Sequence, residues 1–335
     1  HRRLSLALII RSGTFAGRHV CAWRPVSYRG KATGEQDMMM RRTWLALAGE
    51  LLLIAGFATL FRASELYASQ PAPAADHYVF TDWDGPDLPV FCQLPDRVMP
   101  QTPVVFVMHG VHRDADRYGD EWAALARKHG FIAVVPQFGA ADFPGSNGYN
   151  TGYFAEADGT PRPRDLWSFA AIEPLFDDVR ERFSTGATRY SIYGHSAGAQ
   201  FVHRFVLFMP EARIDRAIAT DGGWYTMPDP ATAFPYGLGA APVDEQALTA
   251  TLGKRMTVLL GTADTDRDDP DLRKTPEADA QGPHRFARGQ AFFAQGQQAA
   301  AARNVPFGWT LVTVPDVGHS NGKMAAAAAA QLVAD

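Results

Sequence analysis

Tyr190-Ser191-Ile192-Tyr193-Gly194-His195-Ser196-Ala197-Gly198 is the stretch of this 335-residue sequence that decides the fold. An apolar strand pattern runs into Gly-x-Ser-x-Gly, and apolar residues at helical spacing follow directly. A sharp turn of this kind presents a serine hydroxyl above a sheet, and its glycines permit close approach of the backbone. Ser196 is therefore the predicted nucleophile, and the alternative is that the motif is only a tight loop.

Strand and helix patterns alternate on both sides of this stretch. Strands are expected at 103–108, 131–135, 189–193, 214–220, 256–260 and 308–314, and helices at 116–129, 169–183, 197–208, 290–303 and around the alanine run 325–330. Such alternation predicts an α/β fold with a mostly parallel central sheet and helices on both faces. Prolines within 87–95 favour an edge strand there, and the Gly-, Asn- and Pro-rich segment 137–164 is expected to be a long loop near the site.

A serine nucleophile needs a general base, which an acid must orient. His319 follows the last expected strand, at the carboxyl end of the sheet, and is the predicted base. Asp264 follows strand 256–260 and is the predicted acid, because the acid comes between nucleophile and base in this chain order. Asp266, two residues further on, and Asp221, after the preceding strand, stay open as alternative acids.

The predicted oxyanion hole combines two backbone N–H groups. One belongs to Ala197, directly after the nucleophile, where the start of a helix leaves N–H groups unpaired. The other is assigned to Val111, with His112 as the alternative, in the loop after strand 103–108. The residues expected to contact substrate are a neighbour of the nucleophile and two aromatic residues that also suit ordinary packing: His195, Trp224 and Tyr225.

Composition and charge exclude several classes of protein. Hydrophobic residues make up 46% and charged residues 20%, which is typical of a soluble globular chain and not of a disordered one. A formal charge of −4 provides no basic field for a nucleic-acid partner. Two cysteines cannot form a disulfide framework or a multi-cysteine zinc site. The turn His109-Gly110-Val111-His112 lacks the Gly-x-Gly-x-x-Gly of a dinucleotide site, so no cofactor is expected.

The acidic segment 264–271 is a candidate calcium-binding loop. It begins like an EF-hand, but Asp269 stands where the loop needs glycine and Thr275 where it needs glutamate. No metal is expected here, and an irregular calcium site is the alternative to a solvated acidic loop.

The first 75 residues differ in composition from the rest. Residues 1–37 are basic and are interpreted as upstream or mis-started sequence, with a transit peptide as the alternative. Residues 38–75 combine a basic start, an apolar run and a Pro- and Ala-rich linker, which predicts a signal peptide and export to the periplasm or the exterior. An uncleaved anchor over 44–61 is the alternative, and Glu50 in its middle argues against a stable membrane span. Residues 76–335 are then expected to form a single catalytic domain.

Four strings carry a family resemblance, and they lie at 104–110, 193–205, 259–266 and 314–321. From about residue 88 onward the chain resembles the α/β-hydrolase superfamily and, within it, the bacterial polyhydroxybutyrate-depolymerase-like serine esterases. The resemblance implies Ser196, Asp264 and His319 as nucleophile, acid and base, in agreement with the assignment from the residues. It implies hydrolysis of small carboxylic esters or of hydroxyalkanoate-type polyesters through an acyl-enzyme. An amidase or peptidase with the same triad, or a non-catalytic binding protein on this scaffold, is the alternative.

Overall fold

One eight-stranded sheet organises the computed structural model, which describes residues 75–334. Its strands follow each other in the order β1 (Ala75–Phe80), β2 (Leu88–Gln93), β4 (Ile132–Pro136), β3 (Val104–Met108), β5 (Tyr190–His195), β6 (Ile214–Thr220), β7 (Met256–Gly261) and β8 (Trp309–Val314). The pairings of β1 with β2 and of β2 with β4 are antiparallel, and all the others are parallel. This mostly parallel sheet confirms the predicted α/β-hydrolase fold.

The central strands explain why the sheet is parallel. Every residue of β3 and β4 is buried, as expected of apolar, β-branched strands covered by helices on both faces. In the register, Met108 lies opposite Gly194, and His195 lies opposite Thr220. The carboxyl ends of β3, β5 and β6 are therefore level, and the loops that follow them meet at one edge of the sheet.

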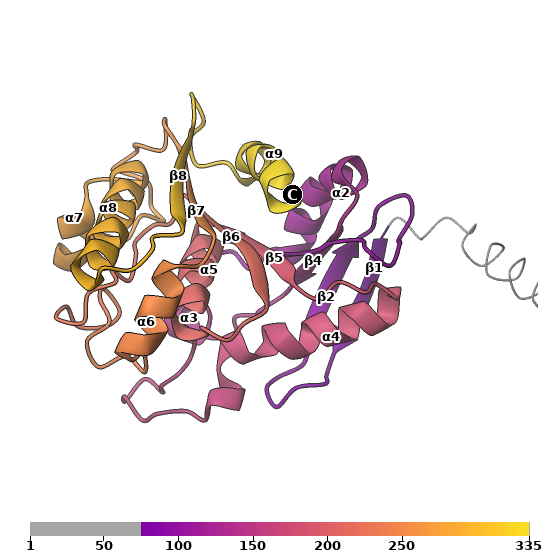
Figure 1. Ribbon diagram of the computed structural model, residues 1–335, viewed down its shortest axis with the longest axis horizontal. Coiled ribbons are helices and arrows are strands. Elements are labelled where there is room, and N and C mark those ends of the chain that lie inside the picture. The colour runs from indigo at the N-terminus through magenta and orange to yellow at the C-terminus, as the bar shows by residue number, and fades with distance from the viewer. Residues whose placement is uncertain (1–74, 335) are drawn as a thin grey trace, which may run out of the picture. The chain divides into compact units, whose positions relative to one another are not determined.

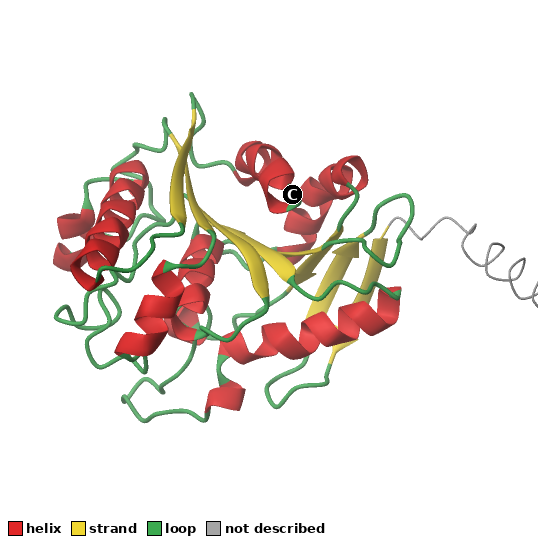
Figure 2. Ribbon diagram, viewed as in Figure 1, coloured by secondary structure: helices red, strands yellow, loops and turns green. Residues whose placement is uncertain are grey.

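Helices cover both faces of the sheet (Figures 1 and 2). One face carries α2 (Ala115–His129) and α9 (Asn321–Leu332), whose buried residues form one apolar cluster with the sheet. The other carries α4 (Ile172–Phe183), α5 (Ala197–Phe208), α6 (Glu245–Leu252) and α8 (Arg285–Arg303), with a second and larger cluster. The shorter helical segments are α3 (Gly145–Gly148), α7 (Pro276–Gln281) and two 3₁₀ turns, Arg164–Leu166 and Ser168–Ala171. The two apolar faces thus hold the sheet rigidly beneath the site.

Helix α5 is buried along its whole length, which fixes the residue at its start. Its aromatic side chains pack into the larger core, where Phe201 stacks at 6.0 Å from Phe205. On the opposite face, α2 ends at Gly130 in the left-handed conformation, as the Lys-His-Gly sequence predicts. Helix ends and strand ends are therefore set by local residues, while the core sets their position.

Two predictions about elements were wrong, and two helices were missed. The strand expected at an edge, β2, lies between β1 and β4, and Pro89 is tolerated because pairing with β4 begins only at Val90. Helix α8 begins at Arg285 rather than at residue 290, because the imidazole of His284 accepts a hydrogen bond from the N–H of Ala287 and caps the helix. Helices α6 and α7 were not predicted, because both are too short to show a clear period.

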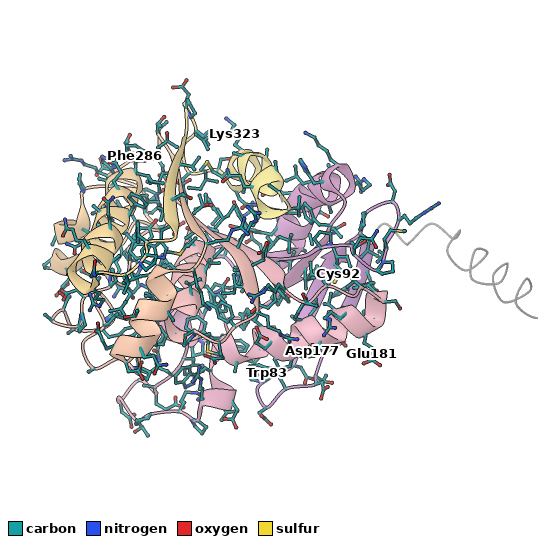
Figure 3. The ribbon with its side chains drawn as sticks, viewed as in Figure 1. Trp83, Cys92, Asp177, Glu181, Phe286 and Lys323 are labelled. Atoms are coloured by element: carbon teal, nitrogen blue, oxygen red, sulfur yellow. The ribbon has the colours of Figure 1, made fainter. Side chains whose placement is uncertain are left out.

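The predicted leader segments, 1–37 and 38–75, lie outside the described residues, apart from Ala75 at the start of β1. Within residues 75–334, no helix combines the length and the apolar character needed to span a membrane. Cys92 is a free, buried thiol on β2, on the side of the sheet that α4 covers (Figure 3). It packs in the larger core cluster, so its role in this fold is that of a small apolar residue.

Candidate active site

Ser196 occupies a strained turn between β5 and α5. Its backbone φ and ψ of 59° and −118° lie in a region that residues other than glycine rarely adopt. A Cβ added at Gly194 would lie 2.2 Å from the carbonyl oxygen of Gly198, and one added at Gly198 would lie 2.0 Å from that of Met108. The two glycines of the motif are therefore required for the strand, the turn and the helix to pack this closely, and the turn exposes the serine at the edge of the sheet.

His319 and Asp264 are joined by a hydrogen bond of 2.8 Å between Nδ1 and Oδ2. Asp264 is only 2% exposed, whereas His319 is partly accessible. With Nδ1 directed to the carboxylate, Nε2 is the ring nitrogen left to act as a base. His319 and Ser196 line the same cavity, of about 310 Å³, although no hydrogen bond joins their side chains in the described part of the chain. Such contacts commonly tighten when substrate binds.

Arg285 is a buried cation next to the acid. Its place beside Asp264 was not predicted from the sequence. It is 1% exposed, and its Nη1 lies 3.7 Å from Oδ1 of Asp264 and 2.8 Å from Oδ2 of Asp269. The hydrogen bond from this guanidinium lowers the pKa of Asp269. Arg285 begins α8, so a helix packed on the sheet places positive charge beside Asp264.

The two alternative acids have different surroundings. Asp266 is exposed and accepts a hydrogen bond of 2.8 Å from the N–H of Asp268, which is a local turn contact. Asp221 is fully buried at the end of β6, and its Oδ1 accepts a 2.9 Å hydrogen bond from the N–H of Gly261. Burial, and then the neighbouring charge of Asp264, raise the pKa of Asp221 well above its ordinary value. Asp221 is therefore harder to ionise than an ordinary aspartate, and Arg285 opposes this shift only in part.

One group of potential metal ligands comes together among residues 75–334. A ring nitrogen each of His195 and His319 and a carboxylate oxygen of Asp221 lie within 4.8 Å of one another. His195 lines the cavity, and its ring lies 4.4 Å from that of His319. Burial lowers the pKa of His195, so the imidazole packed against His319 is neutral. A cation held here would compete for the imidazole that Asp264 orients, so the group does not suit a metal cofactor of a serine hydrolase.

The predicted oxyanion loop contributes residues to the cavity that Ser196 and His319 also line. Val111 and His112 both line the cavity, inside a turn closed by a 3.2 Å hydrogen bond from the N–H of Arg113 to the carbonyl of Gly110. Ala197, the other predicted donor, is the first residue of α5. The N–H groups named from the sequence therefore come from two elements that meet at Ser196.

The long loop 137–164 supports this turn from below. The hydroxyl of Tyr149 donates a 2.9 Å hydrogen bond to the carbonyl of His109, and the guanidinium of Arg113 lies 4.4 Å from the Tyr149 ring centre. Arg113 also donates to three carbonyl groups of the loop, those of Phe138, Phe143 and Gly145. No local sequence pattern predicts these contacts, because each of them joins residues more than 20 positions apart.

Polar and charged residues that line the cavity or lie beside it contact each other. Nε2 of His112 lies 3.5 Å from Oδ2 of Asp271, which links the loop after β3 to the acidic loop after β7. Arg117 forms ion pairs with Asp114 and Glu121 on its own helix. The acidic loop thus distributes its carboxylates over different partners.

The two aromatic residues predicted to bind substrate are buried. Tyr225 packs in the core, with its ring centre 4.6 Å from that of Phe292, and its hydroxyl accepts a hydrogen bond from the N–H of Gly222. Trp224 is 3% exposed, and the guanidinium groups of Arg204 and Arg273 lie 4.1 Å and 4.4 Å from its ring centre. Neither residue lines the catalytic cavity.

No protein-family model and no curated protein matches the chain. Several solved structures are similar to it. Poly(aspartic acid) hydrolase-1 from Sphingomonas sp. KT-1 is 48% identical, with a TM-score of 0.76 over 78% of this chain and 98% of that one. LpqC from Bordetella parapertussis, a poly(3-hydroxybutyrate) depolymerase, is 34% identical, with a TM-score of 0.73 over 77% of this chain and 90% of that one. The fluorophosphonate-binding serine hydrolase FphF from Staphylococcus aureus, at 14% identity and a TM-score of 0.51 over 78% of this chain and 99% of that one, shares the fold alone.

Proposed function

Because the chain belongs to the α/β-hydrolase superfamily, as a polyhydroxybutyrate-depolymerase-like member and hence a hydrolase, we propose that it cleaves carboxylic esters through Ser196, His319 and Asp264. The observation that carries the proposal is the 2.8 Å hydrogen bond between His319 and the buried Asp264, beside a cavity that Ser196 also lines. A base held by an acid next to a serine in a strained turn is the arrangement that activates a hydroxyl group.

The reaction has two acyl-transfer steps. Ser196 Oγ attacks the substrate carbonyl while Nε2 of His319 takes the hydroxyl proton, and Asp264 stabilises the imidazolium that forms. The N–H groups of Ala197 and Val111 donate hydrogen bonds to the oxyanion. The leaving group departs with the proton from His319, and water then attacks the acyl-enzyme, again losing its proton to His319. Ser196 is restored, and one bond has been hydrolysed without a cofactor.

Polyesters of hydroxyalkanoates are the proposed polymeric ester substrates, in keeping with the 34% identity to LpqC. Amide cleavage in a polymer of aspartate is the second candidate, and one specific observation favours it. The Sphingomonas poly(aspartic acid) hydrolase is 48% identical over 98% of its own length. An amide needs a protonated amine as its leaving group, and the imidazolium of His319 would supply that proton.

A substrate panel tests the proposal. Purified protein is assayed on p-nitrophenyl butyrate, hydroxybutyrate oligomers, a polyester film and polyaspartate, with the Ser196→Ala variant as the blank. We expect turnover of the short ester and of at least one polymer, all lost in the variant. Turnover that persists in Ser196→Ala, or no turnover of any ester or amide by the wild type, would contradict the proposal.

Export of the protein is a further part of the proposed function. It rests on the basic and apolar sequence of residues 38–75, which is typical of a secretory signal. The full chain, expressed in a bacterium, is expected in the periplasm or medium at a mass reduced by its leader. Retention of the full-length chain in the cytoplasm would argue against it.

A further inference from the structure

Trp224 contacts two arginine side chains, and neither has an acidic partner in the described part of the chain. The guanidinium centres of Arg204 and Arg273 lie 4.1 Å and 4.4 Å from its ring centre, close enough for strong cation–π contacts. Their neighbours Arg285 and Arg288 form ion pairs with Asp269 and Asp279, whereas neither stacked arginine forms an ion pair within residues 75–334.

Arg273 is fixed in place yet keeps its terminal nitrogens free. Its Nε donates a 2.7 Å hydrogen bond to the hydroxyl of Tyr236, which also contacts Thr275 Oγ1 at 2.7 Å. Its carbonyl accepts a 2.9 Å hydrogen bond from Arg288. No hydrogen bond occupies Nη1 or Nη2 of this half-buried side chain among the described residues. An arginine held through Nε presents the pair of N–H groups that matches a carboxylate.

Arg204 places a second positive charge at the Trp224 ring. It is fully buried, and all of its partners are neutral oxygens, those of Thr226, Asn150 and Gln200. Its Nη2 has no partner in the described part of the chain. A buried cation without a counter-charge is costly, and an anion bound at Arg273 would offset that cost.

The arginine pair is connected to the catalytic serine through α5 and through the loop that carries Asp271. Ser196, Gln200 and Arg204 are spaced four residues apart, so they form one row on α5 that spans about 12 Å. Asp271, two residues before Arg273, lines the catalytic cavity. An extended chain rises about 3.3 Å per residue, so this distance corresponds to about three or four units of a polymer.

We propose that Arg273, supported by Arg204 on the same Trp224 ring, binds a carboxylate of the substrate about three or four units from the bond that Ser196 attacks. Of the two candidate polymers in the proposed function, this subsite favours the second, polyaspartate, which carries a carboxylate on each unit, over the neutral hydroxyalkanoate polyesters. This proposal rests on the proposed function, because it takes Ser196 as the point of attack.

Direct binding tests the subsite separately from catalysis. Titration calorimetry measures the binding of an aspartate oligomer of about eight units to the Ser196→Ala protein, and to the same protein carrying Arg273→Gln or Lys274→Gln. Lys274 is the matched control, since it is the exposed cation next along the chain. We expect Arg273→Gln to weaken binding by about 10- to 100-fold, as for loss of a charged hydrogen-bonded partner, and Lys274→Gln by less than about threefold. Arg273→Lys should regain part of the loss, because lysine keeps the charge but not the paired geometry.

Equal weakening by Arg273→Gln and Lys274→Gln would overturn the subsite and indicate diffuse attraction, as would equally tight binding of a neutral oligomer of hydroxybutyrate. Failure of the proposed function has a different signature, namely a wild-type protein that does not turn over p-nitrophenyl butyrate. Circular dichroism of each variant shows whether its fold is intact.

Discussion

Two aspartates at the ends of neighbouring parallel strands have carboxyl groups with different partners. Asp221 follows β6 and Asp264 follows β7, and both are buried. Asp264 contacts the imidazole of His319 and has Arg285 nearby, whereas Asp221 accepts a hydrogen bond from a backbone N–H only. Burial, and then the charge of Asp264, raise the pKa of Asp221, which favours the protonated form of that carboxyl group. The comparison teaches that position at the end of a strand brings an acid to the site, and that only one of the two acids is hydrogen-bonded to the imidazole of His319.

The largest effect is expected from His319→Ala, because either acid would act through this imidazole. We expect kcat for p-nitrophenyl butyrate to fall by about 10⁶-fold, since members of a triad act as a unit. Steady-state kinetics, corrected with blanks that contain no enzyme, measures the loss of kcat. A His319→Ala variant within tenfold of the wild type would remove the basis for comparing the two acids.

Asp264→Asn is expected to lower kcat by about 10⁴-fold, because the amide stabilises neither the correct tautomer nor the imidazolium. Asp266→Asn is the matched control, since that side chain is exposed in the same loop, and its kcat should stay within about twofold of the wild type. Both are measured on the same ester. Wild-type activity in Asp264→Asn would transfer the role of acid to another residue, with Asp221 as the first to examine.

Asp221→Asn is expected to change stability more than activity, with kcat within about tenfold of the wild type. A raised native pKa means that the unfolded chain ionises first as pH rises above the ordinary value of 3.8, which destabilises the native state until the native pKa is passed. Asparagine cannot ionise and keeps an oxygen for the N–H of Gly261. The melting temperature of the variant minus that of the wild type should therefore increase between pH 4 and pH 8, by roughly 3 °C or more.

Melting curves at several pH values check this sign. A difference that stays constant or shrinks as pH rises would mean that Asp221 is ionised in the native protein. The contrast between the two strand ends would then be lost.

The nucleophile turn was predictable from sequence because its requirements are local. Gly194 and Gly198 are needed for contacts within a few residues of Ser196 or with the adjacent strand, and the strand and helix patterns adjoin them. His319 was predictable for a related reason, since it follows the last strand of the sheet. The mostly parallel topology likewise follows from the order of buried strands and helices.

The residues around the triad were not predictable in this way. Arg285 approaches Asp264 only because α8 begins five residues earlier than its apolar period suggests. Tyr149 and Arg113 meet beneath the oxyanion loop across a long segment without a repeating pattern. The sequence favoured Asp264 over Asp266 for its place at the end of a strand, but it did not predict the buried Arg285 beside Asp264. Such partners are set by packing between distant elements, and a single sequence does not contain that information.

Covalent labelling of Ser196 is the most direct test of the account. The wild-type protein and Ser196→Ala are incubated with a fluorophosphonate, and intact mass and peptide mapping follow. We predict one phosphonyl adduct on the wild type, located on Ser196, and an unlabelled, folded Ser196→Ala variant. An adduct on the alanine variant, or on any other serine of the wild type, would contradict the central claim that Ser196 is the nucleophile of this hydrolase.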